Sequence, residues 1–161
     1  MAPIAIVHVA TGLVALASGV IVFFNNKGTQ FHRWVGYTYV FAMVALNVTA
    51  LMIYRLFGRF GPFHVLALVS LATIIVGFIP AYRKQPAATW MKKHFRWMSS
   101  SYIGLVAATA SEIIVRVPPP GFIASRTIFF GLIFGASAAV GVIGGYLIRR
   151  YARAEFGPPR P

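Results

Sequence analysis

The sequence predicts an all-α integral membrane protein, built as a five-helix transmembrane bundle. Of its 161 residues, 58% are hydrophobic and only 11% are charged, whereas a soluble domain carries about 25% charged residues. The mean hydropathy is +0.75. Five stretches contain the roughly 20 mostly apolar residues that a helix needs to cross a bilayer. They are residues 3–24, 34–54, 62–82, 97–115 and 127–148.

The connections between these stretches consist of residues that end helices. The first stretch stops at Asn-Asn-Lys-Gly (25–28), and the second stops before Gly-Arg-Phe-Gly-Pro (58–62). A basic segment (83–96) follows the third stretch. Pro-Pro-Pro-Gly (118–121) follows the fourth and forms a stiff linker. The chain therefore divides into a four-helix core (1–116), a Pro-rich linker (117–126), a fifth transmembrane helix (127–149) and a basic, Pro-rich cytoplasmic tail (150–161).

The positive charges are unevenly divided between the two sides of this bundle. Eleven of the 15 Lys and Arg residues fall on the side of residues 25–33, 83–96 and the tail, and four fall on the other. Because cytoplasmic loops are enriched in Lys and Arg, we expect the N-terminus outside and the C-terminus in the cytoplasm. The predicted localisation is a plasma membrane, which the chain crosses several times and whose lipids surround it.

Composition excludes several classes of function. The chain has no cysteine, which excludes disulfides, iron–sulfur ligation and thiol chemistry. The net charge of +13 does not indicate nucleic acid, because the basic residues lie between apolar stretches rather than along one helix. The short connections leave no soluble domain, and the candidate partners are a redox partner or a larger membrane complex.

The four histidines are the main candidates for a functional site. His8, His32, His64 and His94 each lie near the start of one of the first four apolar stretches. Because successive helices run antiparallel, His8 and His64 are predicted at the outer face, and His32 and His94 at the cytoplasmic face. Two histidine pairs could hold two cofactors across a bilayer. Alternatively, each histidine could belong to an ordinary interfacial belt.

Small residues follow two of these histidines at helical spacing. Gly12 lies four residues after His8, and Gly36 lies four residues after His32. Small residues permit either close helix packing or a flat macrocycle against the backbone, and the sequence does not separate these alternatives.

Glu112 is the only acidic residue inside a predicted span. It follows His94 by 18 residues, which is five helical turns, so we expect it on the same inward face, near the outer membrane surface. An ionisable residue within a span is a functional candidate. The alternative is an ion pair with Arg116, four residues later.

The fifth predicted helix has no ionisable residue between Arg126 and Arg149. It carries two small-xxx-small spacings, Gly131 with Gly135 and Gly141 with Gly145, of the kind that lets helices approach closely. We expect this helix to pack on the core, with a homo-oligomer formed through it as the alternative.

The segment His32-Arg33-Trp34-x-Gly36-x-x-Tyr39 carries a family resemblance. Together with His8 and the His94…Met98…Ser101-Tyr102 stretch, it resembles a bacterial family of small integral membrane proteins known only as a domain of unknown function. The resemblance covers about the first 116 residues and implies a location in the bacterial inner (plasma) membrane without an activity.

The placement of the histidines is also similar to that in di-haem transmembrane b-type cytochromes, which move electrons from ascorbate. In those proteins helices one and three hold one haem, and helices two and four hold the other. The resemblance implies that His8 with His64 ligate an outer haem and His32 with His94 an inner one. Arg33 and its basic neighbours would then pair with haem propionates.

Three functions follow from these observations. The first is membrane electron transfer with one or two bis-histidine b-type haems. The second is a structural or accessory membrane subunit without a cofactor. The third is a zinc-type site at the outer face made of His8, His64 and Glu112, which could activate water for hydrolysis. The sequence leaves open whether the protein is an enzyme.

Overall fold

The computed structural model describes residues 3–54, 58–116 and 125–156, without the side chains of Val115, Arg116, Arg126 and Glu155. These ranges contain helices and turns but no strand, which confirms the predicted all-α bundle. The helices are α1 (Pro3–Phe24), α2 (Gln30–Leu51), α3 (Pro62–Arg83), α4 (Trp90–Arg116) and α5 (Arg126–Phe156).

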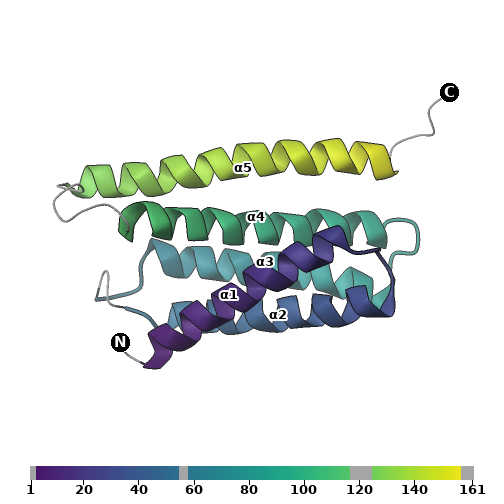
Figure 1. The fold of residues 1–161 in the computed structure, drawn as a ribbon, viewed down its shortest axis with the longest axis horizontal. Coiled ribbons are helices and arrows are strands. Elements are labelled where there is room, and N and C mark those ends of the chain that lie inside the picture. Colours follow the sequence, from purple (N-terminus) through teal and green to yellow (C-terminus); the bar gives the residue numbers. More distant parts are fainter. Residues whose placement is uncertain (1–2, 55–57, 117–124, 157–161) are drawn as a thin grey trace.

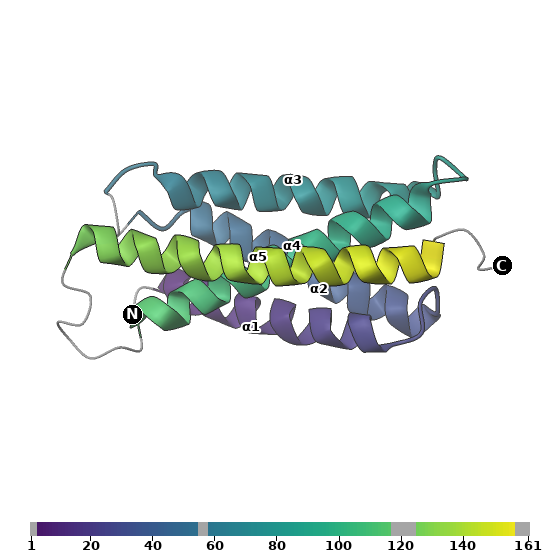
Figure 2. The same cartoon turned by 90° about the horizontal axis from the view of Figure 1, so that it is seen from above.

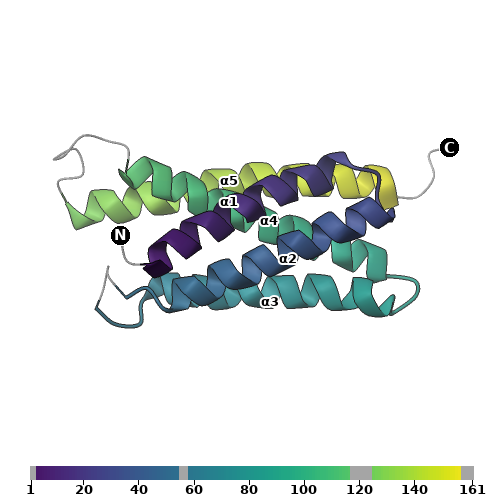
Figure 3. The same cartoon turned by 60° about the horizontal axis from the view of Figure 1, so that its bottom comes forward.

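The helices run alternately along one long axis, and α1 crosses α2 and α3 at an angle (Figure 1). Seen from above, α4 and α5 cross each other (Figure 2), and Figure 3 shows α2 between α1 and α3. Each helix packs on the next in the chain, and α1 also packs on α4. The first four helices therefore form a ring, in which α2 lies diagonally opposite α4 and α1 opposite α3. No Cα atoms of a diagonal pair come within 8 Å of each other in the described residues. The α1–α2 and α3–α4 connections share one end of the bundle, which we call the basic end.

Four helical segments have the length and hydropathy needed to cross a membrane, namely α1, α2, α3 and residues 127–154 of α5. The other helix, α4, is more polar because it carries three consecutive serines (99–101) and Glu112. It is also the most covered helix, since it packs on α1, α3 and α5. Polar residues in a membrane bundle normally face its interior, and the buried Ser99, Ser101 and Ser111 of α4 agree with this central place.

Three helices extend beyond the apolar stretches that predicted them. α2 begins at Gln30 rather than residue 34, because the Thr29 hydroxyl caps it by accepting a bond from the His32 N–H at 3.1 Å. α4 begins at Trp90 rather than residue 97, and α5 continues to Phe156 into the predicted tail. Hydropathy does not detect polar helical turns at a membrane surface, so it places these ends too far inward. Most of the predicted linker (117–124) and the chain after residue 156 lie outside the described residues.

The core of the ring contains Ala15, Tyr39, Ala42, Met43, Ile74 and Leu105. Glycines allow the closest approaches around it. A Cβ at Gly19 would overlap the ring of Tyr102, and one at Gly77 would lie 2.9 Å from the Met98 sulfur. These two contacts join α1 and α3 to α4.

The fifth helix packs on α4 through a glycine that the sequence analysis did not select. A Cβ at Gly144 would lie 2.5 Å from the Ile103 side chain, whereas nothing lies within 4 Å of one at Gly131, Gly135 or Gly141. The expectation that α5 packs on the core agrees with the structure, but the glycine spacings proposed for that contact face elsewhere. Spacing alone does not give the rotation of a helix about its axis.

Gly144 and Gly135 provide a matched test of this contact. We expect Gly144→Ala to destabilise the protein by about 1–3 kcal/mol, because overpacking displaces Ile103. Gly135→Ala should be neutral or stabilising by up to about 1 kcal/mol, because alanine favours helix over glycine. Unfolding of both variants in one detergent measures the difference, and equal stabilities would contradict the assigned α4–α5 contact.

Candidate functional site

The structure brings two of the four histidines together at the basic end. His32 lies in the first turn of α2 and His94 near the start of α4. Their ring centroids are 6.5 Å apart, with the ring planes at 80°. Since α2 and α4 are diagonal partners, the two imidazoles meet across the interior of the ring rather than at a helix contact. The alternation of the helices predicts both residues on the same side, and in the structure their rings lie next to each other.

The imidazole of His94 has a defined tautomer. Its Nδ1 lies 2.9 Å from the backbone oxygen of Gly77 in α3. A carbonyl oxygen only accepts, so Nδ1 carries the hydrogen and donates it, which leaves a lone pair on Nε2. A metal-ligating histidine typically has this arrangement, because the bond at the second nitrogen orients the ring.

The imidazole of His32 is half-buried, and its Nδ1 is buried without a hydrogen-bond partner among the described residues. A buried nitrogen of this kind is costly unless something pairs with it. One turn further along α2, a Cβ at Gly36 would have nothing within 4 Å. The space next to His32 is therefore open, as a flat ligand would require.

Basic side chains surround this histidine pair. The exposed members on the first two turns of α2 and α4 are Arg33, Lys92, Lys93 and Arg96. In the α1–α2 connection, the Lys27 ammonium donates to the backbone oxygens of Val22 and Phe23 at 2.6 and 2.7 Å. Burial lowers the pKa of Lys27 from its usual range. The basic end thus offers several cations to an anionic group.

The outer histidine of α1 contacts α2. His8 Nδ1 lies 3.1 Å from the Thr49 hydroxyl oxygen and 3.2 Å from the Leu46 backbone oxygen. The Thr49 hydroxyl itself donates to backbone oxygens of its own helix, so the His8 Nδ1–H donates toward this pair of oxygens. These bonds attach the N-terminal half of α1 to the end of α2.

His64 occupies the first turn of α3, where it is 3% exposed. Its Nδ1 accepts the Gly61 backbone N–H at 3.1 Å, closing a capping interaction. Neutral His64 therefore carries its hydrogen on Nε2, and that buried N–H has no partner among the described residues. The ring lies between those of Tyr54 and Phe60, at centroid distances of 4.7 and 4.9 Å. In this arrangement neither ring nitrogen of His64 has a free lone pair.

The proposed outer set of His8, His64 and Glu112 is not gathered into one cluster. Among the described residues, no three His, Asp or Glu side chains come together as a metal site. Glu112 is exposed, so its predicted position on the inward face is wrong. Near its end α4 buries Ala107 and Ser111, and Ser111 donates to the Ile133 oxygen of α5. With α5 covering that side, the next residue is turned outward.

A family model matches this chain over most of its length. The match spans residues 5–151, which include all four histidines and most or all of each of the five helices. The chain belongs to the family described as "Predicted membrane protein (DUF2306)". No curated protein and no solved structure matches the chain. Membership of DUF2306 confirms the predicted membrane family of unknown function and adds no activity.

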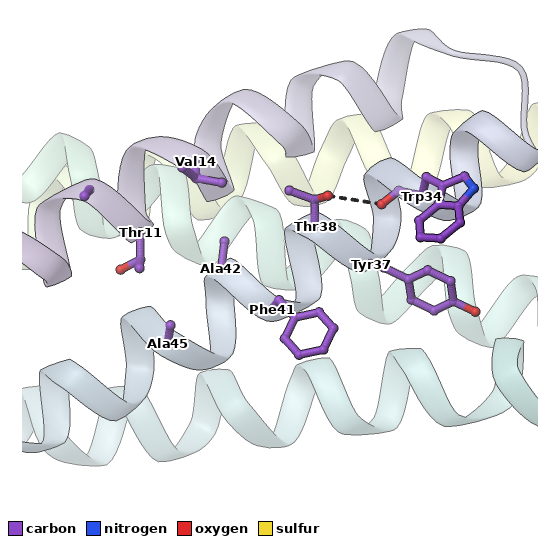
Figure 4. A pocket seen from close by; sticks show the side chains of 9 residues that line it. Thr11, Val14, Trp34, Tyr37, Thr38, Phe41, Ala42 and Ala45 are labelled. Carbon is purple, nitrogen blue, oxygen red and sulfur yellow. Dashed lines mark hydrogen bonds between the residues drawn. The ribbon is translucent and has the colours of Figure 1, made fainter.

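The DUF2306 chain also has a groove between α1 and α2 that the sequence did not reveal. Its volume is about 620 Å³, and none of the four histidines lines it. Figure 4 shows Trp34, Tyr37 and Phe41 along one wall, and the dashed line marks the bond from the Thr38 hydroxyl to the Trp34 oxygen. Ala42 and Ala45 of α2 and Ala10, Thr11 and Val14 of α1 line the rest of the groove, which is mostly apolar.

This DUF2306 protein also has a second interaction between α2 and α4, which was not predicted from its sequence. The Tyr39 hydroxyl and Ser101 Oγ are 2.8 Å apart in the bundle interior. The sequence did contain a signal, because Tyr39 follows His32 by seven residues and Ser101 follows His94 by seven. An equal offset on two helices places two pairs of residues on one shared seam.

Proposed function

We propose that this protein is a membrane electron-transfer protein that binds one b-type haem between His32 and His94. The observation that carries the proposal is the pair of imidazoles, 6.5 Å apart, with His94 oriented by the Gly77 oxygen. Imidazole–metal bonds are about 2.0–2.1 Å long, so the centres of two rings on opposite sides of one metal lie on the order of 6 Å apart. The observed separation is close to that value.

The residues around the pair fit haem in three further respects. The unpartnered Nδ1 of His32 shows that this imidazole is not committed to another bond in the described structure. The open space at Gly36 leaves room for a macrocycle against α2. Exposed Arg33 and Arg96, with the neighbouring lysines, would pair with propionates. Bound there, haem iron would supply one-electron transfer between its ferric and ferrous states.

A second haem at the outer pair has less support. The hydrogen bond from Gly61 would have to break before His64 offered a lone pair. The space next to Gly12 is filled by the packing of α1 on α2, because a Cβ there would lie 3.5 Å from the Leu46 side chain. The same arguments disfavour the zinc-type alternative. We therefore propose one haem, and by the positive-inside rule we place it at the cytoplasmic side of a bacterial inner membrane.

One observation favours a second candidate function, an accessory subunit of a membrane complex. In the described part of the chain, α4 is the one helix on which α5 packs. Its apolar side chains are widely exposed, for example Phe134 at 61% and Val142 at 70%. That surface could contact lipid, a partner subunit or a second copy of the chain. A protein that purifies without any cofactor would favour this function.

Absorption spectra of the purified protein, oxidised and then reduced with dithionite, test the proposal. We expect sharp reduced bands and about one haem per chain by pyridine haemochrome assay, because only the His32–His94 pair has ligating geometry. Two haems per chain would show that His64 changes its hydrogen bonding on binding. A colourless protein from haem-replete cells would refute the electron-transfer proposal.

A further inference from the structure

A buried hydrogen bond joins the two helices that carry the histidine pair. Tyr39 of α2 is 3% exposed and Ser101 of α4 is 4% exposed, and their hydroxyl oxygens are 2.8 Å apart. The Ser101 hydroxyl donates its hydrogen to the Met98 backbone oxygen at 2.9 Å. Ser101 Oγ therefore receives the Tyr39 O–H, which gives the bond a definite direction.

This bond lies on the same seam as the two imidazoles. α2 and α4 both begin at the basic end, so they run in parallel. Seven residues are almost two helical turns and advance about 10 Å along the axis. Tyr39 therefore lies further from the basic end than His32, on the same face of α2. Ser101 is placed in the same way relative to His94 on α4. The two pairs are successive bridges across one gap.

The gap between α2 and α4 is wide, and the Tyr39 side chain and the two imidazoles are long enough to extend into it. No Cα atoms of α2 and α4 come within 8 Å in the described residues, because the helices are diagonal in the ring. The Tyr39 ring fills the space and also packs against the Tyr102 ring at 6.2 Å. Next to it, Met43 and Leu105 make the interior apolar. An unpaired hydroxyl is costly in such surroundings, so the bond restricts both the spacing and the rotation of the two helices.

We propose that Tyr39 and Ser101 are positioning residues, which fix α2 against α4 and thereby set the separation and the crossing angle of the His32 and His94 rings. The proposal rests on the proposed function in so far as the two rings ligate haem. The positioning itself is a property of the chain and is testable without haem.

The 80° angle between the rings gives a spectroscopic test. Nearly perpendicular imidazole planes leave the two iron d orbitals that overlap with them almost equal in energy. Low-spin ferric haem then shows one strongly anisotropic EPR feature, whereas parallel planes give three resolved features. We expect the single feature in the native protein. Tyr39→Phe and Ser101→Ala should each lose it in favour of a spread or three-feature spectrum.

A distance measurement tests the positioning independently of haem. The chain has no cysteine, so Phe31→Cys and Lys93→Cys introduce two unique labelling sites, both exposed and each adjacent to one histidine. Spin labels there report the distance between the beginnings of α2 and α4. We expect Tyr39→Phe and Ser101→Ala to broaden or shift the distance distribution. Ser101→Thr keeps the hydroxyl and should restore the native distribution.

Tyr37→Phe is the matched control, because Tyr37 lies on the exposed side of α2 and packs against Trp34 and Phe78. It should match the native protein in both measurements. If Tyr39→Phe and Ser101→Ala also match it in both, the positioning role is refuted. A colourless protein whose distance distribution still responds to Tyr39→Phe would refute the haem proposal and support the positioning role.

Discussion

A His94→Phe variant is expected to retain the fold and to lose at least nine-tenths of the bound haem. Phenylalanine fills a similar volume, but it removes the Nε2 lone pair that the Gly77 hydrogen bond exposes. One remaining imidazole, that of His32, would not hold the group in place. Haem per chain, measured by pyridine haemochrome on protein purified from haem-replete cells, gives the result. His32→Phe should behave in the same way.

His64→Phe is the control for this experiment. The new ring can occupy the same place between Tyr54 and Phe60, and only the capping bond from Gly61 is lost. Haem content should stay at the native level, with a modest loss of stability from the cap. The opposite pattern, in which His64→Phe loses haem and His94→Phe retains it, would move the site to the other end of the bundle.

The sequence predicted the helices and the side of the bundle on which each histidine lies. Both depend on patterns along the chain, since about 20 apolar residues make a span and successive spans alternate in direction. The pairing of His32 with His94 followed from this alternation. The alternation favoured a pair of His8 with His64 equally, because each of the two pairs joins diagonal helices at its own end of the bundle.

The differences between the two histidine pairs arise from local hydrogen bonds that a pattern does not contain. His64 is the third residue of α3, where its Nδ1 caps the helix. His94 is the fifth residue of α4, where its Nδ1–H reaches the Gly77 oxygen of the neighbouring helix. The Nε2 of His64 is thereby left as an N–H donor, and the Nε2 of His94 is left with a lone pair. The choice of tautomer depends on contacts between helices, which one sequence does not specify.

Helix rotation accounts for the remaining differences. Glu112 shares a helix face with His94 by spacing, but α5 covers the adjacent Ser111 and leaves Glu112 exposed. Gly144, rather than the regularly spaced glycines, meets Ile103 for the same reason. Among the described residues α4 packs on three helices and α5 on one, and hydropathy alone does not indicate which faces these contacts bury. The contact surfaces of α4 and α5 therefore had to come from the structure.

A Gly19→Val variant should be the most destabilising single change at a helix contact, with a loss of about 2–3 kcal/mol from overpacking. A side chain at Gly19 would overlap the Tyr102 ring, and that ring is held in place because its hydroxyl donates to the Leu16 oxygen at 3.2 Å. Tyr102 also packs on Phe23 and Tyr39, at 5.2 and 6.2 Å. Displacing it would disturb the α1–α4 contact and the core together.

Gly104→Val makes the same substitution at an exposed position of α4 where nothing lies within 4 Å of a Cβ. It should leave the unfolding midpoint in detergent close to that of the native protein. Comparing the two variants isolates the clash, because valine brings the same rotamer restriction to both helices. If Gly19→Val were as stable as Gly104→Val, α1 would not approach α4 at this glycine. The haem content of Gly19→Val then measures how strongly the α1–α4 contact is coupled to the histidine pair. The link is the Tyr102 ring, which packs on the Tyr39 ring about two helical turns from His32.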